Sequence, residues 1–173
     1  MDQSALIGIG RKKITAIGLC SFNRDKDEIS LALMTLTGMK LLEMERKNGK
    51  TETYFSISEI TNKKSASEQL VMDIKSIYFQ PTKRYENCEI RKDKIIYKWA
   101  KGEKKTILIF GQSSKREKVV LLIKKQYIND TLESLVYYSD YKINNGKKIP
   151  MTIHYQNRKF DYTLILKTKK IYL

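Results

Sequence analysis

The stretch SASEQLVMDIKSIYF, from Ser65 to Phe79, decides the fold of this chain. Between Lys12 and Tyr172, most other apolar segments alternate with polar residues as β-strands do. In this stretch, apolar residues recur instead at the spacing of one helix face, at Leu70, Ile74, Ile77 and Tyr78. Ser65 and Glu68 have the spacing of a capping box, and Pro81 blocks further helix. The stretch therefore predicts one main helix within a chain of strands.

The remaining segments predict about eleven antiparallel strands joined mostly by short turns. The sequence Asn48-Gly49 between two strands predicts a type I′ hairpin turn, and Asn144-Asn145-Gly146 predicts another turn. Several strands are apolar on both faces, such as Val119–Ile123, so both faces must be covered. We predict a mainly β (α+β) fold: a strongly curved antiparallel sheet, or unclosed β-barrel, whose concave side is plugged by the helix. The strands are expected at Lys12–Phe22, Glu28–Thr37, Lys40–Arg46, Thr51–Ile57, Arg84–Arg91, Lys94–Ala100, Lys104–Phe110, Arg116–Gln126, Glu133–Ile143, Lys148–Tyr155 and Lys159–Tyr172.

Length and composition indicate one domain that spans residues 1–173, in which residues 1–10 form an N-terminal segment. The 34 basic and 19 acidic residues give a net charge of +15, but lysine pairs are spread along the whole chain. We expect most of this charge to be solvated surface at strand ends and turns. The alternative is attraction to an anionic membrane face or to nucleic acid.

The two cysteines and the termini give weaker signals. Cys20 and Cys88 are expected to be small buried residues, although a disulfide in an oxidising compartment is the alternative. No apolar run approaches the roughly 18 residues of a membrane-spanning helix. The first residues, Met1 to Ser4, lack the pattern of a signal peptide, so the protein is either cytoplasmic or has lost a leader.

The sequence shows no reaction chemistry, and we predict no enzyme, no cofactor and no metal site. The single histidine, His154, has no Cys, His or Asp cluster with ligand spacing around it. Glu43 and Glu45 share one strand face beside a basic turn, which indicates a solvated cross-strand charge ladder. The many tyrosines among lysines could stack on single-stranded nucleic acid, but they also suit half-buried strand positions, and we favour the second interpretation.

Three segments carry a resemblance to a known family: Gly38–Glu45, Gln69–Pro81 and the terminal pair of strands from Ile149. With the order of strands, hairpin, helix and further strands, the chain resembles the LolA/LolB type of lipoprotein localisation factor and envelope lipoproteins of unknown role that share its plan. The resemblance implies an open barrel that holds acyl chains, in a protein that is periplasmic or is anchored to a membrane through a removed lipoprotein leader. Two features depart from the family: Lys47 and Lys50 flank the hairpin turn where the outer-membrane receptor exposes an apolar residue, and no lipid-attachment cysteine lies near the start.

We therefore expect non-enzymatic binding of lipid or acyl chains, as a lipoprotein or lipid carrier or a receptor-like protein of the bacterial cell envelope. The expected partners are a lipid or acyl-chain ligand and an anionic membrane surface. The first alternative is a nucleic-acid or polyanion-binding module, which we consider less well supported. The second is a structural or assembly protein that contacts an envelope protein partner. The candidate apolar lining comprises Leu31, Leu33, Met44, Phe55, Leu70, Ile74, Ile77, Tyr78, Trp99, Leu108 and Phe110.

Overall fold

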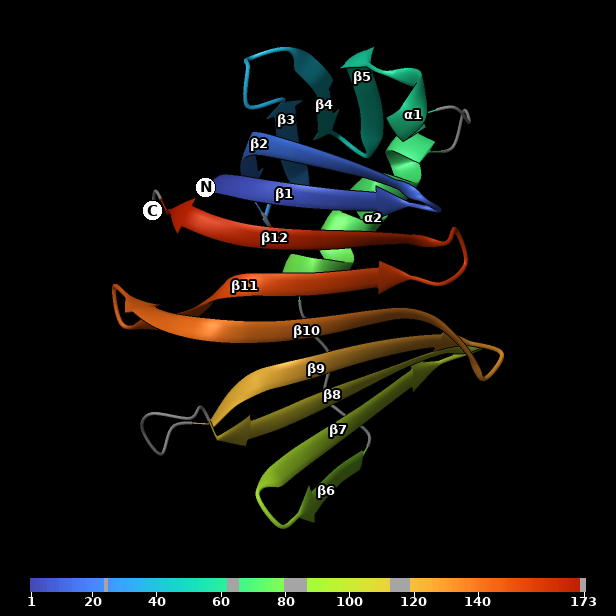
Figure 1. The fold of residues 1–173 in the computed structure, drawn as a ribbon. Coiled ribbons are helices and arrows are strands. Elements are labelled where there is room, and N and C mark those ends of the chain that lie inside the picture. The colour runs from blue at the N-terminus through green and yellow to red at the C-terminus, as the bar shows by residue number, and fades with distance from the viewer. Residues whose placement is uncertain (24, 62–65, 80–86, 113–118, 172–173) are drawn as a thin grey trace. The chain divides into compact units, whose positions relative to one another are not determined.

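A computed structural model describes residues 1–23, 25–61, 66–79, 87–112 and 119–171 (Figure 1). The helices in this part of the chain are α1 (Ser58–Thr61) and α2 (Ala66–Tyr78). The strands are β1 (Asp2–Ile9), β2 (Lys12–Asn23), β3 (Glu28–Met34), β4 (Lys40–Lys47), β5 (Lys50–Ser56), β6 (Asn87–Arg91), β7 (Lys94–Lys101), β8 (Lys104–Gln112), β9 (Val119–Ile128), β10 (Thr131–Asn144), β11 (Lys147–Asn157) and β12 (Tyr162–Lys170).

The strands form one sheet of twelve in the order β5-β4-β3-β2-β1-β12-β11-β10-β9-β8-β7-β6. Neighbours along the chain pair antiparallel, as in the β2–β3 and β10–β11 hairpins. Strands β5 and β6 stand at the two ends of this order, so the described strands do not close into a barrel. The predicted fold class, mainly β with an unclosed antiparallel sheet and one main helix, is confirmed.

Strand β1 was not expected, and it accounts for the difference between about eleven predicted strands and the twelve observed. Its buried positions alternate along the strand, at Gln3, Ala5 and Ile7. Because the first of these is polar and the second is small, the sequence lacks the regular apolar alternation by which a strand is recognised. The one-turn helix α1 was not expected either, since it lies between the predicted strand Thr51–Ile57 and the predicted main helix.

The structure divides into two compact units. Unit 1 consists of Met1–Ile7, Lys13–Pro81 and Lys167–Leu173, and unit 2 consists of Gly8–Lys12 and Thr82–Leu166. Each unit is considered separately below. The organisation of the chain as a single domain stays a prediction.

The local signals in the sequence correspond to observed elements. The predicted helix is confirmed over Ala66–Tyr78, whereas the capping residue Ser65 and the terminating Pro81 lie outside the described residues. Asn48 and Gly49 have φ angles of 50° and 78°, as a type I′ turn requires, and the turn at Asn145 has the same character.

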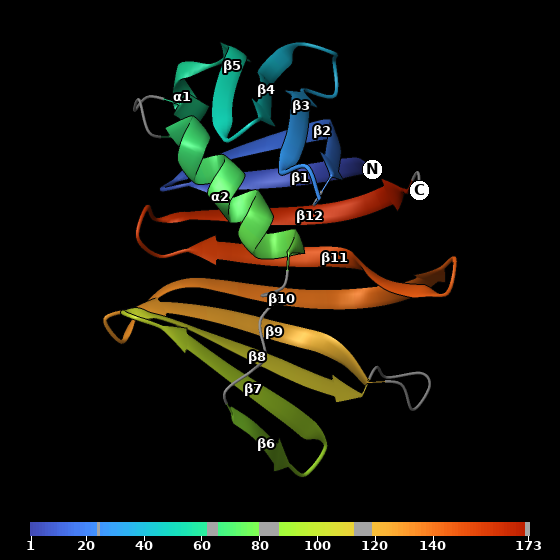
Figure 2. The ribbon, with the colours of Figure 1, turned by 180° about the vertical axis from the view of Figure 1, so that it is seen from behind.

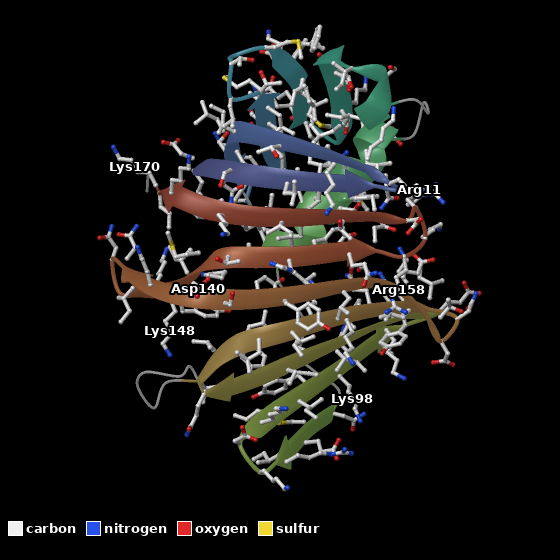
Figure 3. All side chains as sticks on the ribbon, viewed as in Figure 1. Arg11, Lys98, Asp140, Lys148, Arg158 and Lys170 are labelled. Carbon is white, nitrogen blue, oxygen red and sulfur yellow. The ribbon has the colours of Figure 1, made fainter. Side chains whose placement is uncertain are left out.

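Charged side chains of the described residues are mostly exposed at strand ends and in turns, as predicted. Arg11 and Arg158 lie in turns, and Lys148 and Lys170 lie near the ends of β11 and β12 (Figure 3). Within the described ranges, no helix combines the length and the apolar character that are needed to span a bilayer.

Candidate functional site

Unit 1 has a continuous apolar face on strands β2 to β4. The pairing places Leu31 of β3 between Cys20 of β2 and Met44 of β4, and it places Leu33 beside Leu42. All five side chains are at most 8% exposed. Because alternate residues of a strand point to the same side, these positions form one buried surface.

Helix α2 lies against one side of the unit 1 strands (Figure 2), and its main apolar residues are buried. Val71, Ile74 and Ile77 are 1%, 5% and 1% exposed. The ring of Tyr78 stacks on Phe22 of β2, with 5.1 Å between ring centroids. Phe22 alternates in phase with Cys20, so this contact places the helix on the same side of β2 as the apolar face.

Polar contacts also join helix α2 to strand β1 and to the β2–β3 turn. The Tyr78 hydroxyl accepts a hydrogen bond from Gln3 Nε2 of β1 at 2.5 Å, and burial raises the pKa of the Tyr78 hydroxyl. The ammonium of Lys75 pairs with the carboxylate of Asp27 in the β2–β3 turn, and Arg46 Nε of β4 lies 3.3 Å from the same carboxylate. These two cations, Lys75 first, hold the pKa of Asp27 below its usual range.

The structure brings together most of the predicted lining residues that belong to unit 1. Leu31, Leu33 and Met44 lie on the sheet face, and the helix contributes Leu70, Ile74, Ile77 and Tyr78; of these, Leu70 and Tyr78 are half-buried. Phe55 is not brought together with them. It pairs with Glu43 on the opposite face and is 42% exposed.

The other predicted residues, Trp99, Leu108 and Phe110, belong to unit 2 and share one face of its sheet. Leu108 is fully buried, and Trp99 and Phe110 are half-buried. The ring of Phe110 packs edge-on against Tyr97 of β7, with centroids 5.6 Å apart. Unit 2 therefore has an apolar face of its own.

The buried lysine of β9, Lys124, is a residue that sequence reasoning missed. It was grouped with solvated lysine pairs, yet it is 2% exposed. Burial lowers the pKa of its ammonium to about 8. Gln3 was missed as well, because a single glutamine in an unassigned segment gives no signal that it anchors a helix.

Other candidate chemical groups behave as surface or packing residues. Among the described residues, no group of three or more His, Cys, Asp or Glu could hold a metal ion, and His154 is exposed. Glu43 lies 2.5 Å from Lys40 Nζ, and Glu45 lies 2.8 Å from Lys47 Nζ, so both carboxylates form ion pairs. These pairs lie within β4, and the β5 partner of Glu45 is Glu52, so they are not the predicted cross-strand ladder.

Both cysteines are free thiols, one in each unit. Cys20 is buried, and burial raises the pKa of its thiol to about 11. Cys88 is exposed, so the prediction that both cysteines are buried was wrong for this residue. It lies on β6, an end strand of the sheet, where fewer neighbours cover its side chain.

Comparison with solved structures identifies proteins of the same fold. A candidate outer membrane lipoprotein-sorting protein domain from Vibrio parahaemolyticus aligns with a TM-score of 0.56 and 10% identity, covering 98% of this chain and 82% of that one. A LolA superfamily protein from Nitrosomonas europaea aligns with a TM-score of 0.55 and 11% identity, covering 99% and 86%. A DUF1329 family protein from Desulfovibrio piger aligns with a TM-score of 0.54 and 10% identity, and the alignment covers 96% of this chain and 81% of that one.

These similarities confirm the predicted resemblance to LolA-type proteins at the level of the fold. No protein-family model matches the sequence, and no curated protein is significantly similar to it.

Proposed function

We propose that this protein binds lipid or acyl chains without catalysing a reaction, as a carrier or receptor-like component of the bacterial cell envelope. The observation that carries the proposal is the apolar sheet face of unit 1 with the amphipathic helix α2 packed on it. The fold likeness to a lipoprotein-sorting domain and to a LolA superfamily protein supports the same role.

The mechanism would use the helix as a movable cover of the apolar face. Its buried side is mostly apolar but includes the carboxylate of Asp73, and its polar links to the sheet include a salt bridge with a partly exposed carboxylate and a tyrosine hydrogen bond. Exposed ion pairs contribute little stability, so the salt bridge adds little to the cost of displacing the helix, and loss of apolar contact is a large part of that cost. An acyl chain replaces that contact, because each buried methylene contributes about 0.8 kcal/mol.

The proposal includes a location and surface partners. We infer a periplasmic protein, or one that is anchored to a membrane as a lipoprotein after removal of its leader. The positive surface would then approach anionic lipid headgroups, since juxtamembrane basic residues each contribute about 1 kcal/mol near such a surface. Binding to vesicles with and without anionic lipid, at low and high salt, measures this contribution.

Native mass spectrometry of the purified protein, followed by organic extraction, tests the proposed ligand. We expect a co-purified fatty acid or phospholipid, or uptake of one on incubation. The variant Ile74→Glu should lose it, because the carboxylate enters the apolar contact between helix and sheet. Met72→Glu is the matched control, since Met72 lies on the same helix and is 53% exposed.

The outcome that contradicts acyl binding is an unchanged apo mass after incubation with fatty acids and phospholipids. That result would indicate that α2 packs permanently against the sheet and leaves no space for a ligand. It would favour the alternative of a structural or assembly protein. A row on the other face of unit 2 is consistent with that role: Ile96, Ile109, Ile123 and Tyr137 are consecutive cross-strand partners, and Tyr137 is 49% exposed. Binding to nucleic acid, the remaining alternative, would weaken steeply with salt.

A further inference from the structure

One face of unit 2 carries a row of isoleucines that crosses adjacent strands. Ile96 of β7, Ile109 of β8 and Ile123 of β9 are direct cross-strand partners, so their side chains lie on the same face. The row continues on β10 to Tyr137, the partner of Ile123. The three isoleucines are half-buried and Tyr137 is 49% exposed, so part of the row is accessible to solvent. We call the face of β7 to β10 that carries this row the isoleucine face.

Lysines lie beside the row on the isoleucine face. The next row, two residues along each strand, joins Lys98 of β7 (labelled in Figure 3), Ile107 of β8 and Lys125 of β9. One row further, Lys105 of β8 pairs with Tyr127 of β9, and the ammonium of Lys105 lies 5.8 Å from the centre of the Tyr127 ring. The aliphatic row therefore has cations along one side.

The charge of the isoleucine face is positive. The described strands β7, β8 and β9 contain no Asp or Glu. Two of the lysines pair with acidic groups at the margins: Lys98 Nζ lies 3.3 Å from Glu89 of β6, and Lys105 Nζ lies 3.7 Å from Asp130. Glu89 also pairs with Arg91, and the side chain of Asp130 is 91% exposed, so the face keeps its positive charge.

This charge is not only a consequence of the basic composition of the chain. The face of β4 and β5 in unit 1 that carries Glu43 mixes the two signs, since Glu45 is the cross-strand partner of Glu52, and Lys47 is the partner of Lys50. An apolar row with cations and without acidic residues on the same strands therefore distinguishes the isoleucine face.

The side chains of the isoleucine face favour a lipid surface over other partners. Protein–protein interfaces are depleted in lysine. Binding of single-stranded nucleic acid uses rings that stack on bases, whereas the centre of this face is aliphatic and Lys105 lies over the Tyr127 ring. Lysine side chains place their stems along apolar residues and extend their ammonium groups outward. An anionic bilayer complements both the isoleucines and the lysines.

We propose that the isoleucine face docks on the surface of an anionic lipid bilayer. The isoleucine row and Tyr137 would contact the headgroup region, and the ammonium groups of Lys98 and Lys125 would contact lipid phosphates. This inference rests on the proposed function, because it names the surface through which the protein would reach anionic lipid. It does not use the apolar face beneath α2, so the two proposals can fail separately.

Binding to phosphatidylcholine vesicles with and without phosphatidylglycerol tests the assignment. The unsubstituted protein should bind the anionic vesicles more tightly, and high salt should weaken that binding. Lys125→Gln should weaken it about fivefold, as expected for one basic residue near an anionic surface. Lys125→Glu should weaken it about ten- to thirtyfold, because a repulsive charge replaces an attractive one.

Matched variants on unit 1 control for net charge and for loss of a tyrosine ring. Lys50→Glu changes the net charge as Lys125→Glu does, but Lys50 is exposed in the β4–β5 hairpin, and it should weaken binding less than about twofold. Tyr137→Ser should weaken binding to anionic vesicles more than Tyr54→Ser does, since Tyr54 is 59% exposed on β5 and lies outside the isoleucine face.

Three outcomes would overturn the docking face. Equal binding of the unsubstituted protein to neutral and anionic vesicles does so without any variant. Equal weakening by Lys125→Glu and Lys50→Glu assigns the preference to net charge. Vesicle binding that no variant of the isoleucine face changes leaves the row to a protein partner, or to nucleic acid if Lys125→Glu weakens binding to single-stranded DNA.

Uptake of fatty acid, measured on the same protein by native mass spectrometry, separates this inference from the proposed function. Uptake without a preference for anionic vesicles contradicts the docking face alone. A preference that Lys125→Glu removes, without uptake of any acyl chain, supports the docking face and contradicts acyl binding.

Discussion

Replacing Asp27 by asparagine should loosen the attachment of helix α2 without disturbing its apolar contact. The carboxylate of Asp27 joins Lys75 of the helix to Arg46 of β4 within unit 1. Its side chain is 43% exposed, whereas those of Lys75 and Arg46 are 22% and 18% exposed. Partly exposed pairs contribute up to about 1 kcal/mol each, and screening reduces this, so Asp27→Asn should lower the free energy of unfolding by about 1 kcal/mol.

The pH dependence of that difference follows from the direction of the pKa shift. Lys75 and then Arg46 hold the pKa of folded Asp27 below its usual range, so the stabilisation is present above the pKa of the unfolded chain. It is lost as the pH falls through the folded pKa. Urea unfolding of both proteins should therefore differ at pH 7, and the difference should shrink from about pH 4 downward.

High salt should reduce the same difference at pH 7, because it screens partly exposed charges. Asp25→Asn is the matched control in the same turn, since Asp25 is exposed, and it should change stability by less than about 0.5 kcal/mol. A difference between Asp27→Asn and the unsubstituted protein that is equal at pH 7 and at low pH would refute the electrostatic explanation. If the helix moves to admit ligand, Asp27→Asn should also accelerate acyl-chain uptake in stopped-flow measurements.

Three further substitutions test the packing of unit 1 by urea unfolding. Gly18→Ala should destabilise the protein by about 1–3 kcal/mol, because a Cβ there would lie 2.5 Å from a leucine side chain and 2.7 Å from a carbonyl oxygen of β3; an unchanged midpoint would contradict this close approach. Ile77→Ala should cost about 2–5 kcal/mol, whereas Met72→Ala on the exposed side of the helix should cost less than about 0.5 kcal/mol, and equal costs would argue against the assigned helix face. Tyr78→Phe should cost about 1 kcal/mol by removing the hydrogen bond from Gln3, and no loss would indicate that packing alone holds the helix end.

Local signals in the sequence were sufficient to predict the helix and the hairpin turns. The hairpin turn depends on two adjacent residues, Asn48 and Gly49, which tolerate the positive φ angles that the turn requires. The helix depends on a repeat of apolar residues that lies entirely within Ala66–Tyr78. Neither depends on distant parts of the chain. The fold class was therefore predictable from these elements and from the count of strand-like segments.

The faces of the strands were less predictable, because a bulge changes the phase of alternation. Thr53 and Phe55 are two residues apart, which normally places them on the same face. The register shift in the β4–β5 pair lets Thr53 oppose Met44 and Phe55 oppose Glu43, which lie on opposite faces of β4. No residue pattern within β5 announces this shift, since it depends on pairing with another strand.

The burial of one lysine of β9 could have been predicted from the order of residues in this strand, although the basic composition of the chain suggested only solvated lysines. Two adjacent residues of a regular strand point to opposite faces, so Lys124 and Lys125 cannot both be on the outside of a sheet. The preceding residues of β9 are apolar on both faces, which predicts that both faces are at least partly covered. The pair therefore requires a lysine on each face, and the pairing of Lys124 with Leu108 and Val136 identifies which of the two is buried. A lysine that the alternation of a strand places on a covered face needs a counter-charge or hydrogen bonds to offset the cost of desolvation. Urea unfolding of Lys124→Met, with Lys125→Met as the matched control, measures what this burial contributes to the free energy of unfolding.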